Sequence, residues 1–219
     1  MKLQTGILAV AVASGFFFTS CKCNKDTEMT SAVTENDSTE IDTASVIVET
    51  AKLDAEGNYI YDVGDVTEIS LPDGTKLSIG NNSTENKLFT QLNDTNFKVS
   101  SDKTQGWITL DRVYFATGKA DLTPVSEAQI KNVVAILKAF PSSMVKIGGY
   151  TDNTGDAAVN KQVSTDRARI VADQIIANGI DKSRIESEGY GADHFVCPAN
   201  DTDECKAQNR RVDIRVTKK

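Results

Sequence analysis

The sequence predicts an α/β fold, a two-layer sandwich with a mixed sheet, over residues 105–219. Strand-like and helix-like segments alternate there in the order strand, helix, strand, helix, strand, strand, which is typical of helices packed on one sheet. The helical segments carry apolar residues at helical spacing. The last segment, residues 211–217, places apolar side chains on one face and charged ones on the other, as a half-buried strand does.

Boundary signals define the elements of this domain. Thr123-Pro124 opens a helix, because threonine caps helices and proline suits their first position. Asn178-Gly179 is a typical helix stop. The expected elements are strands over 107–115, 143–149, 185–190 and 211–217, and helices from Thr123-Pro124 to Phe140-Pro141 and from Asp156 to Asn178.

Residues 51–104 predict a small β-hairpin and helix extension. Pro72-Asp73-Gly74 is a turn signal between two short alternating segments. Residues 83–93 carry apolar side chains at helical spacing, with Ser83 or Thr84 as the cap. A hairpin and one helix are too small to form a core of their own, so we expect the extension to pack on the C-terminal domain.

Residues 1–20 have the features of a lipoprotein signal peptide. Lys2 precedes an apolar run over residues 7–18, which suits a signal core and is too short to span a bilayer comfortably. The small residues before Cys21 resemble the bacterial lipoprotein cleavage box. This resemblance implies that Cys21 becomes the N-terminus and carries acyl chains such as palmitate. An ordinary secretory signal that leaves Cys21 unmodified is the alternative.

Residues 21–50 are acidic, rich in serine and threonine, and contain no aromatic residue. This composition favours a disordered tether. As a flexible coil it would span about 30 Å, and near full extension about 100 Å, which is enough to lift a domain off a membrane. Cys23 lies in this segment as a free thiol, an interchain bridge or an inert residue.

Composition excludes several classes of function. The formal net charge is −7 and there is no basic block, which argues against nucleic acid or an anionic lipid surface as the partner. The single histidine, His194, is too few for a His-based metal site or triad, and we expect it on a surface loop. We expect no metal, no cofactor and no enzymatic activity, because no nucleophile–base pair appears and nothing near Asp152 or Asp156 would raise one carboxyl pKa.

Cys197 and Cys205 bracket a polar loop, PANDTDE. In an oxidising cell envelope these two cysteines are expected to form a disulfide. A zinc site is the rival interpretation, although His194 is the one other ligand type nearby.

Residues 147–169 place opposite charges around one expected pocket. Asp152 lies where a strand ends, and Arg167 follows on the next helix. An acid and an arginine that face one pocket match a small zwitterion, because the carboxylate pairs with an ammonium and the guanidinium binds a carboxylate through two parallel hydrogen bonds. A structural salt bridge between Asp152 and Arg167 is the alternative.

The same stretch resembles the peptidoglycan-binding motif of the OmpA C-terminal domain family. The resemblance covers about residues 105–219 and implies the same two-layer α/β fold. It is carried by GYTDNTG at residues 149–155, by Asn160, by VSTDRARIVAD at 163–173 and by QNRRVDIRV at 208–216.

The resemblance implies a site for diaminopimelate of the peptidoglycan stem peptide, whose distal end bears an ammonium and a carboxylate. Asp152 would take the ammonium and Arg167 the carboxylate. Asn160 would contact the ligand or hold the loop. Arg211, or equally its neighbour Arg210, would add positive charge or remain solvated.

Signal, tether and domain together imply an outer-membrane lipoprotein whose domain faces the periplasm and holds the membrane to peptidoglycan. The alternative is an interaction component of a trans-envelope machine of the Tol-Pal kind, with envelope proteins as partners.

Overall fold

The computed structural model describes residues 52–115 and 122–219, all within one compact unit of the chain. The expected lipidation site Cys21, the thiol Cys23 and the tether lie outside the described residues. Among the residues described, no helix has the length and apolar character needed to cross a bilayer.

A four-stranded mixed sheet forms one layer of the fold. Its strand order is β3-β6-β4-β5, in which β6 runs antiparallel to β3 and β4, and β4 runs parallel to β5. The order and the mixed pairing confirm the predicted α/β class. The strands are β3 (Trp107–Thr109), β4 (Met144–Gly149), β5 (Ile185–Gly189) and β6 (Val212–Lys218).

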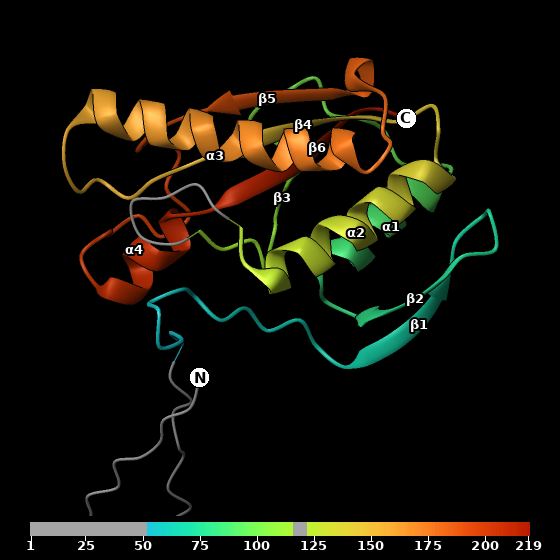
Figure 1. Cartoon of the computed structure of the whole chain (residues 1–219), viewed down its shortest axis with the longest axis horizontal. Helices are drawn as coiled ribbons and strands as arrows, with labels where there is room; N and C mark the ends of the chain where they lie inside the picture. The colour runs from blue at the N-terminus through green and yellow to red at the C-terminus, as the bar shows by residue number, and fades with distance from the viewer. Residues whose placement is uncertain (1–51, 116–121) are drawn as a thin grey trace, which may run out of the picture. The chain divides into compact units, whose positions relative to one another are not determined.

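Two long helices, α2 (Pro124–Ala139) and α3 (Ala157–Ala177), form the second layer (Figure 1). The Thr123 side chain accepts a hydrogen bond from the Ser126 backbone and caps α2, as the sequence predicts. Asp156 caps α3 in the same way. A short 3-10 turn, η1 (Lys182–Arg184), leads from α3 into β5.

The hydrophobic core lies between the two layers. Ile147 and Ile214 of the sheet and Ile136, Leu137 and Ile175 of the helices are almost completely buried in one cluster. Burying each such side chain stabilises the fold by about 1.5–3 kcal/mol relative to leaving it exposed. This core fixes the end of β4 and the inner face of α3.

The upstream extension packs on this domain, as expected. It consists of an antiparallel hairpin, β1 (Val66–Ser70) and β2 (Lys76–Gly80), followed by α1 (Thr84–Asn93). Leu88 and Leu92 of α1 are buried in the same cluster as α2 and the sheet.

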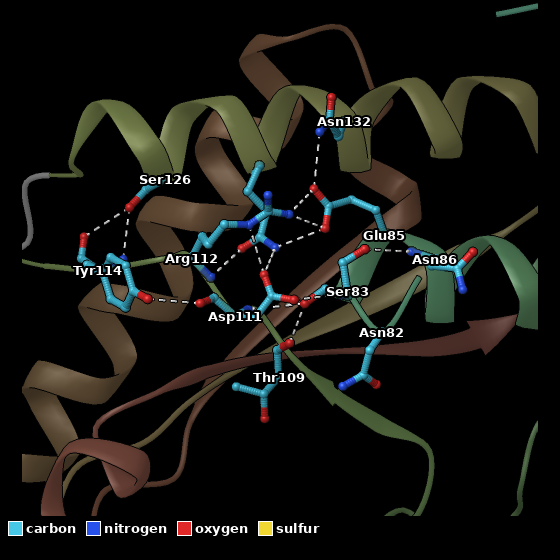
Figure 2. Close-up of polar contacts among 12 residues, drawn as sticks. Asn82, Ser83, Glu85, Asn86, Thr109, Asp111, Arg112, Tyr114, Ser126 and Asn132 are labelled. Atoms are coloured by element: carbon cyan, nitrogen blue, oxygen red, sulfur yellow. Dashed lines mark hydrogen bonds and ion pairs between the residues drawn. The ribbon is translucent and has the colours of Figure 1, made fainter. Parts of the chain in front are cut away.

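A buried polar network fastens α1 to the domain (Figure 2). Glu85 is fully buried, and its two oxygens accept from Arg112 Nη2 at 2.5 and 2.6 Å. Asp111 accepts from Arg112 Nε at 3.0 Å and from the Thr84 backbone N–H at 2.7 Å. The start of α1 is therefore held by the residues that follow β3.

This network explains why the predicted strand over 107–115 is wrong in length. The strand β3 ends at Thr109, and the Val113 N–H then donates to the Leu110 carbonyl in a turn. Asp111 and Arg112 leave the sheet because their side chains bind α1 instead.

The charged face of β6 also differs from the expectation of a solvated face. Arg211, Asp213 and Arg215 are each less than a tenth exposed. Arg215 donates to the carbonyls of Ser100 and Gln105 at 2.7 Å, so the loop before β3 covers it.

A fourth helix, α4 (Asp203–Asn209), begins inside the polar loop expected between Cys197 and Cys205. Thr202 caps it, with Asp203 and Glu204 in the first turn; these start signals are present in the sequence but lie between the two cysteines. The expected disulfide joins Cys197 and Cys205 across 5.2 Å between Cα atoms.

Removing this disulfide is expected to lower the free energy of unfolding by about 2–3 kcal/mol, because the bond closes a short loop in the unfolded chain. The variant carries Cys197→Ala and Cys205→Ala together, and chemical denaturation measures its stability. Wild-type protein under reducing conditions is the matched control and should lose the same amount. If the reductant destabilises the variant as much as the wild type, the loss of stability does not come from the Cys197–Cys205 disulfide.

Candidate functional site

A cleft of about 500 Å³ opens where β4 ends and α3 begins. Its floor and walls come from five parts of the chain: the stretch before β1, the segment after β3, the loop after β4, the inner face of α3 and the α4 segment. All five residues expected at the site line it, namely Asp152, Asn160, Arg167, Arg210 and Arg211.

Asp152 is held as an ionised carboxylate at the end of β4. Its Oδ1 accepts from the Thr154 backbone N–H at 2.9 Å, and its Oδ2 accepts from Arg210 Nη1 at 2.9 Å. Burial acts to raise the pKa of Asp152, but the hydrogen bonds from Arg210 and Thr154 outweigh it and hold that pKa below the usual range. The carboxylate is thus negatively charged at neutral pH.

Arg167 brings a desolvated positive charge to the same cleft. It is 9% exposed, and its Nε has no hydrogen-bond partner among the described residues. Burial, together with the like charge of Arg210, lowers the pKa of Arg167 despite the opposing charge of Asp152. No salt bridge joins it to Asp152, so the described residues do not support the alternative of a structural pair between them.

The guanidinium of Arg167 lies 5.2 Å from the centre of the Phe115 ring. A cation over an aromatic face is attracted to it but keeps its N–H edge available. Arg167 is therefore positioned without spending its hydrogen-bonding capacity on another described residue.

Backbone geometry brings α3 close to β4. A Cβ on Gly149 would lie 2.0 Å from the Ser164 carbonyl oxygen, so only glycine permits this approach. Gly155 adopts a left-handed φ of 89° in the turn between them. The Asn160 side chain donates to the Thr154 carbonyl at 3.1 Å, which fits the loop-holding role for Asn160.

The two adjacent arginines have different positions. Arg210 pairs with Asp152 and also donates to the Gly57 carbonyl at 3.1 Å. Arg211 pairs with Asp213 at 3.0 Å, and its guanidinium lies 3.9 Å from the centre of the Tyr150 ring. Arg210 thus brings charge to Asp152, whereas Arg211 is buried between the cleft and the far side of the sheet.

Residues 56–61 form a wall of the cleft that is not predictable from the sequence. Gly57 accepts from Arg210, and the Tyr59 carbonyl accepts from the Tyr114 hydroxyl at 3.1 Å. Tyr59 and Tyr61 both line the cleft, with their ring centres 4.8 Å apart. The sequence of this segment carries no motif that indicates a site.

Across residues 52–115 and 122–219, no three His, Cys, Asp or Glu side chains group in a way that could hold a metal ion. The cleft instead offers a carboxylate, a guanidinium and aromatic walls.

Comparison with known proteins shows which families and relatives this part of the chain resembles. Residues 114–210 match the model of the OmpA family. Over 107 residues the chain is 38% identical to the probable lipoprotein YiaD of Escherichia coli, covering 49% of this chain and 48% of that protein. Over 104 residues it is 39% identical to the peptidoglycan-binding protein ArfA of Mycobacterium tuberculosis, covering 48% of this chain and 32% of ArfA.

A solved structure is also similar. The peptidoglycan-associated lipoprotein from Burkholderia pseudomallei is 24% identical, with a TM-score of 0.47, over 58% of this chain and 99% of that one.

Residues 114–210 therefore form an OmpA-like domain, which confirms the resemblance seen in its motifs. The chain spans about half of YiaD and a third of ArfA. Asp152, Asn160, Arg167 and Arg210 all lie within the matched residues, whereas the wall at residues 56–61 lies outside them.

Proposed function

We propose that this chain is a non-catalytic peptidoglycan-binding protein whose cleft recognises the zwitterionic end of diaminopimelate. Asp152 accepts the ammonium, and Arg167 binds the carboxylate. Arg210 keeps Asp152 ionised, and Asn160 holds the loop that carries it. Cys21 carries the lipid that anchors the chain in the outer membrane, with the domain in the periplasm.

The observation that carries the proposal is that Asp152 and Arg167 line one cleft without pairing with each other. A buried guanidinium is costly unless something neutralises it, so a ligand carboxylate that pairs with Arg167 gains a strong, two-point interaction. The similarity to ArfA, a peptidoglycan-binding protein, supports this assignment.

Affinity for one stem peptide is expected to be modest. Charge-assisted hydrogen bonds contribute about 1.5–3 kcal/mol each, and the cost of ordering the ligand offsets part of that gain. Tethering many copies beside a polymer with many sites raises occupancy without new contacts. A weak single site is therefore compatible with firm attachment.

Co-sedimentation with purified cell-wall sacculi tests the function. The purified chain should pellet with sacculi that contain diaminopimelate and much less with sacculi that contain lysine, because lysine lacks the distal carboxylate. Equal pelleting with both would contradict diaminopimelate recognition, and no pelleting with either would contradict peptidoglycan binding.

The pH dependence of peptide binding should move when Arg210 is replaced. Asp152 must be ionised to accept the ammonium. Its lowered pKa means that wild-type binding persists as the pH falls and is lost only below the range in which an ordinary aspartate becomes protonated. In Arg210→Ala the pKa of Asp152 rises, so binding should be lost at higher pH. Calorimetry with a free stem peptide at a series of pH values measures both curves.

The free energy of unfolding should depend on pH in the same direction as peptide binding. A depressed folded-state pKa means that Asp152 stabilises the fold above its unfolded-state pKa of about 3.9, and this contribution is lost as the pH falls through the folded-state pKa. Coincident binding curves for wild type and Arg210→Ala would show that Arg210 does not control Asp152.

A further inference from the structure

The face of the sheet opposite α2 and α3 carries a second cleft, of about 820 Å³. Strand alternation places Trp107 of β3, Lys146 of β4 and Glu188 of β5 on this face, and Tyr150 and Tyr190 follow from the ends of β4 and β5. Nothing in the proposed function uses these side chains.

Three aromatic rings form a corner in this cleft. The Tyr150 and Tyr190 rings stack at 5.1 Å between centres, and the Trp107 ring stands at 81° to Tyr190 with centres 5.9 Å apart. Trp107 can lie against the sheet because Gly148 has no side chain; a Cβ there would lie 2.9 Å from the indole. Trp107 and Tyr190 are half-buried, so each ring keeps an accessible part.

The charges in the cleft are largely neutralised within the protein. Lys146 pairs with Glu188, and Arg211 pairs with Asp213. The Arg215 guanidinium donates to three backbone carbonyls. Lys103 and Glu186 also line the cleft, so its four cationic and three anionic side chains leave an excess of one positive charge. The cleft therefore offers aromatic surface and hydrogen-bonding groups with little net charge, which favours a neutral polar ligand over a strongly charged one.

Two buried polar groups that line the cleft keep unused hydrogen-bonding capacity. Arg211 and Asp213 are both more than nine-tenths buried. Arg211 Nη1 and Asp213 Oδ1 have no hydrogen-bond partner among the described residues. Both atoms are enclosed, so the surface that a ligand meets first is the aromatic one. Aromatic rings beside buried polar groups suit a ligand with hydroxyl or amide groups on an apolar ring, since C–H groups contact the negative ring faces.

The two clefts are adjacent, because they share a lining residue. Arg211 lines both, and Tyr150 of the second cleft is two residues from Asp152 of the first. This step depends on the proposed function: a stem peptide held at Asp152 is covalently attached to a sugar chain. A three-residue peptide reaches about 10 Å, so the sugar chain must pass close to the first cleft.

We propose that the aromatic cleft binds the glycan chain of peptidoglycan, a neutral chain of N-acetylated sugars, with a sugar ring against Trp107 and Tyr190. The domain would then hold the polymer at two points, the peptide through Arg167 and the glycan through the aromatic corner.

The single tryptophan of the chain provides a direct test, because Trp107 lies in this cleft. Titrating the purified chain with chitotetraose, a soluble chain of N-acetylglucosamine, should change tryptophan emission to saturation. Tyr190→Ala should weaken this binding by about tenfold, and Tyr190→Phe, which keeps the ring, should bind within about threefold of wild type. Peptide-free glycan strands should compete with chitotetraose.

Free stem peptide separates the two proposals. Tyr190→Ala should bind the stem peptide as wild type does, which also shows that the variant folds, and Arg167→Ala should still bind chitotetraose. No saturable emission change with chitotetraose, or equal binding by Tyr190→Ala and wild type, would overturn the glycan site. Chitotetraose binding that depends on Tyr190, with no stem-peptide binding by wild type, would overturn the proposed function and leave the glycan site standing.

Discussion

Arg167→Ala is expected to weaken binding of a diaminopimelate-containing stem peptide by about 30- to 140-fold. The guanidinium is buried in the cleft and forms no salt bridge with a described residue, so in the proposed function its charge is available to the carboxylate of the ligand. Losing a charge-assisted, two-point interaction costs about 2–3 kcal/mol, and each 1.4 kcal/mol is tenfold in affinity. Calorimetry with the free peptide measures the change.

The control for this variant is Arg169→Ala, two residues along α3. Arg169 is exposed and pairs with Asp166 and Asp173 on the helix surface, so its loss should leave peptide affinity within about twofold.

A lysine-containing stem peptide completes the test. It lacks the carboxylate that Arg167 is proposed to bind, so wild type should bind it weakly and Arg167→Ala should bind both peptides equally. If Arg167→Ala still prefers diaminopimelate, another group recognises the distal carboxylate.

Local signals made much of this fold predictable. Thr123 and Asp156 start α2 and α3 through side-chain caps, and Asn178-Gly179 ends α3, because these interactions involve residues close in sequence. Asp152 and Arg167 were likewise placed at one cleft from the order of a strand, a turn and a helix.

Long-range contacts account for what the sequence did not reveal. The partner of Asp152 is Arg210, 58 residues away, and the wall at residues 56–61 reaches the cleft from a still more distant part of the chain. The early end of β3 depends on Asp111 meeting the Thr84 N–H and on Arg112 meeting Glu85. No periodicity or capping rule encodes such pairings, since each requires two separated segments to be packed already.

These contacts also bear on how the extension and the domain depend on each other. Arg210 links Asp152 to Gly57, and Asp111 links β3 to α1, so the segment before the matched family residues takes part in both the cleft and the core. A substitution in the extension should therefore lower the stability of the whole unit. Glu85 is the residue best suited to test this.

Glu85→Ala is expected to lower the free energy of unfolding by about 2–4 kcal/mol. Glu85 is completely buried and accepts hydrogen bonds from Arg112, Gln129 and Asn132. Removal of the Glu85 carboxylate leaves these buried donors without that hydrogen-bond acceptor. This expected loss of stability is smaller than for a fully buried ion pair, because the Arg112 side chain is 31% exposed and water can solvate part of its charge.

Glu68→Ala is the matched control in the chemical denaturation experiment. Glu68 also pairs with a cation, Lys76, but both side chains are at least 60% exposed, so the loss should be below about 1 kcal/mol. If Glu85→Ala unfolds in a single transition whose midpoint is shifted to lower denaturant concentration, the extension and the domain unfold together. Equal, small losses in the two variants, or an early separate transition of the extension, would mean that the network around Glu85 does not join it to the core.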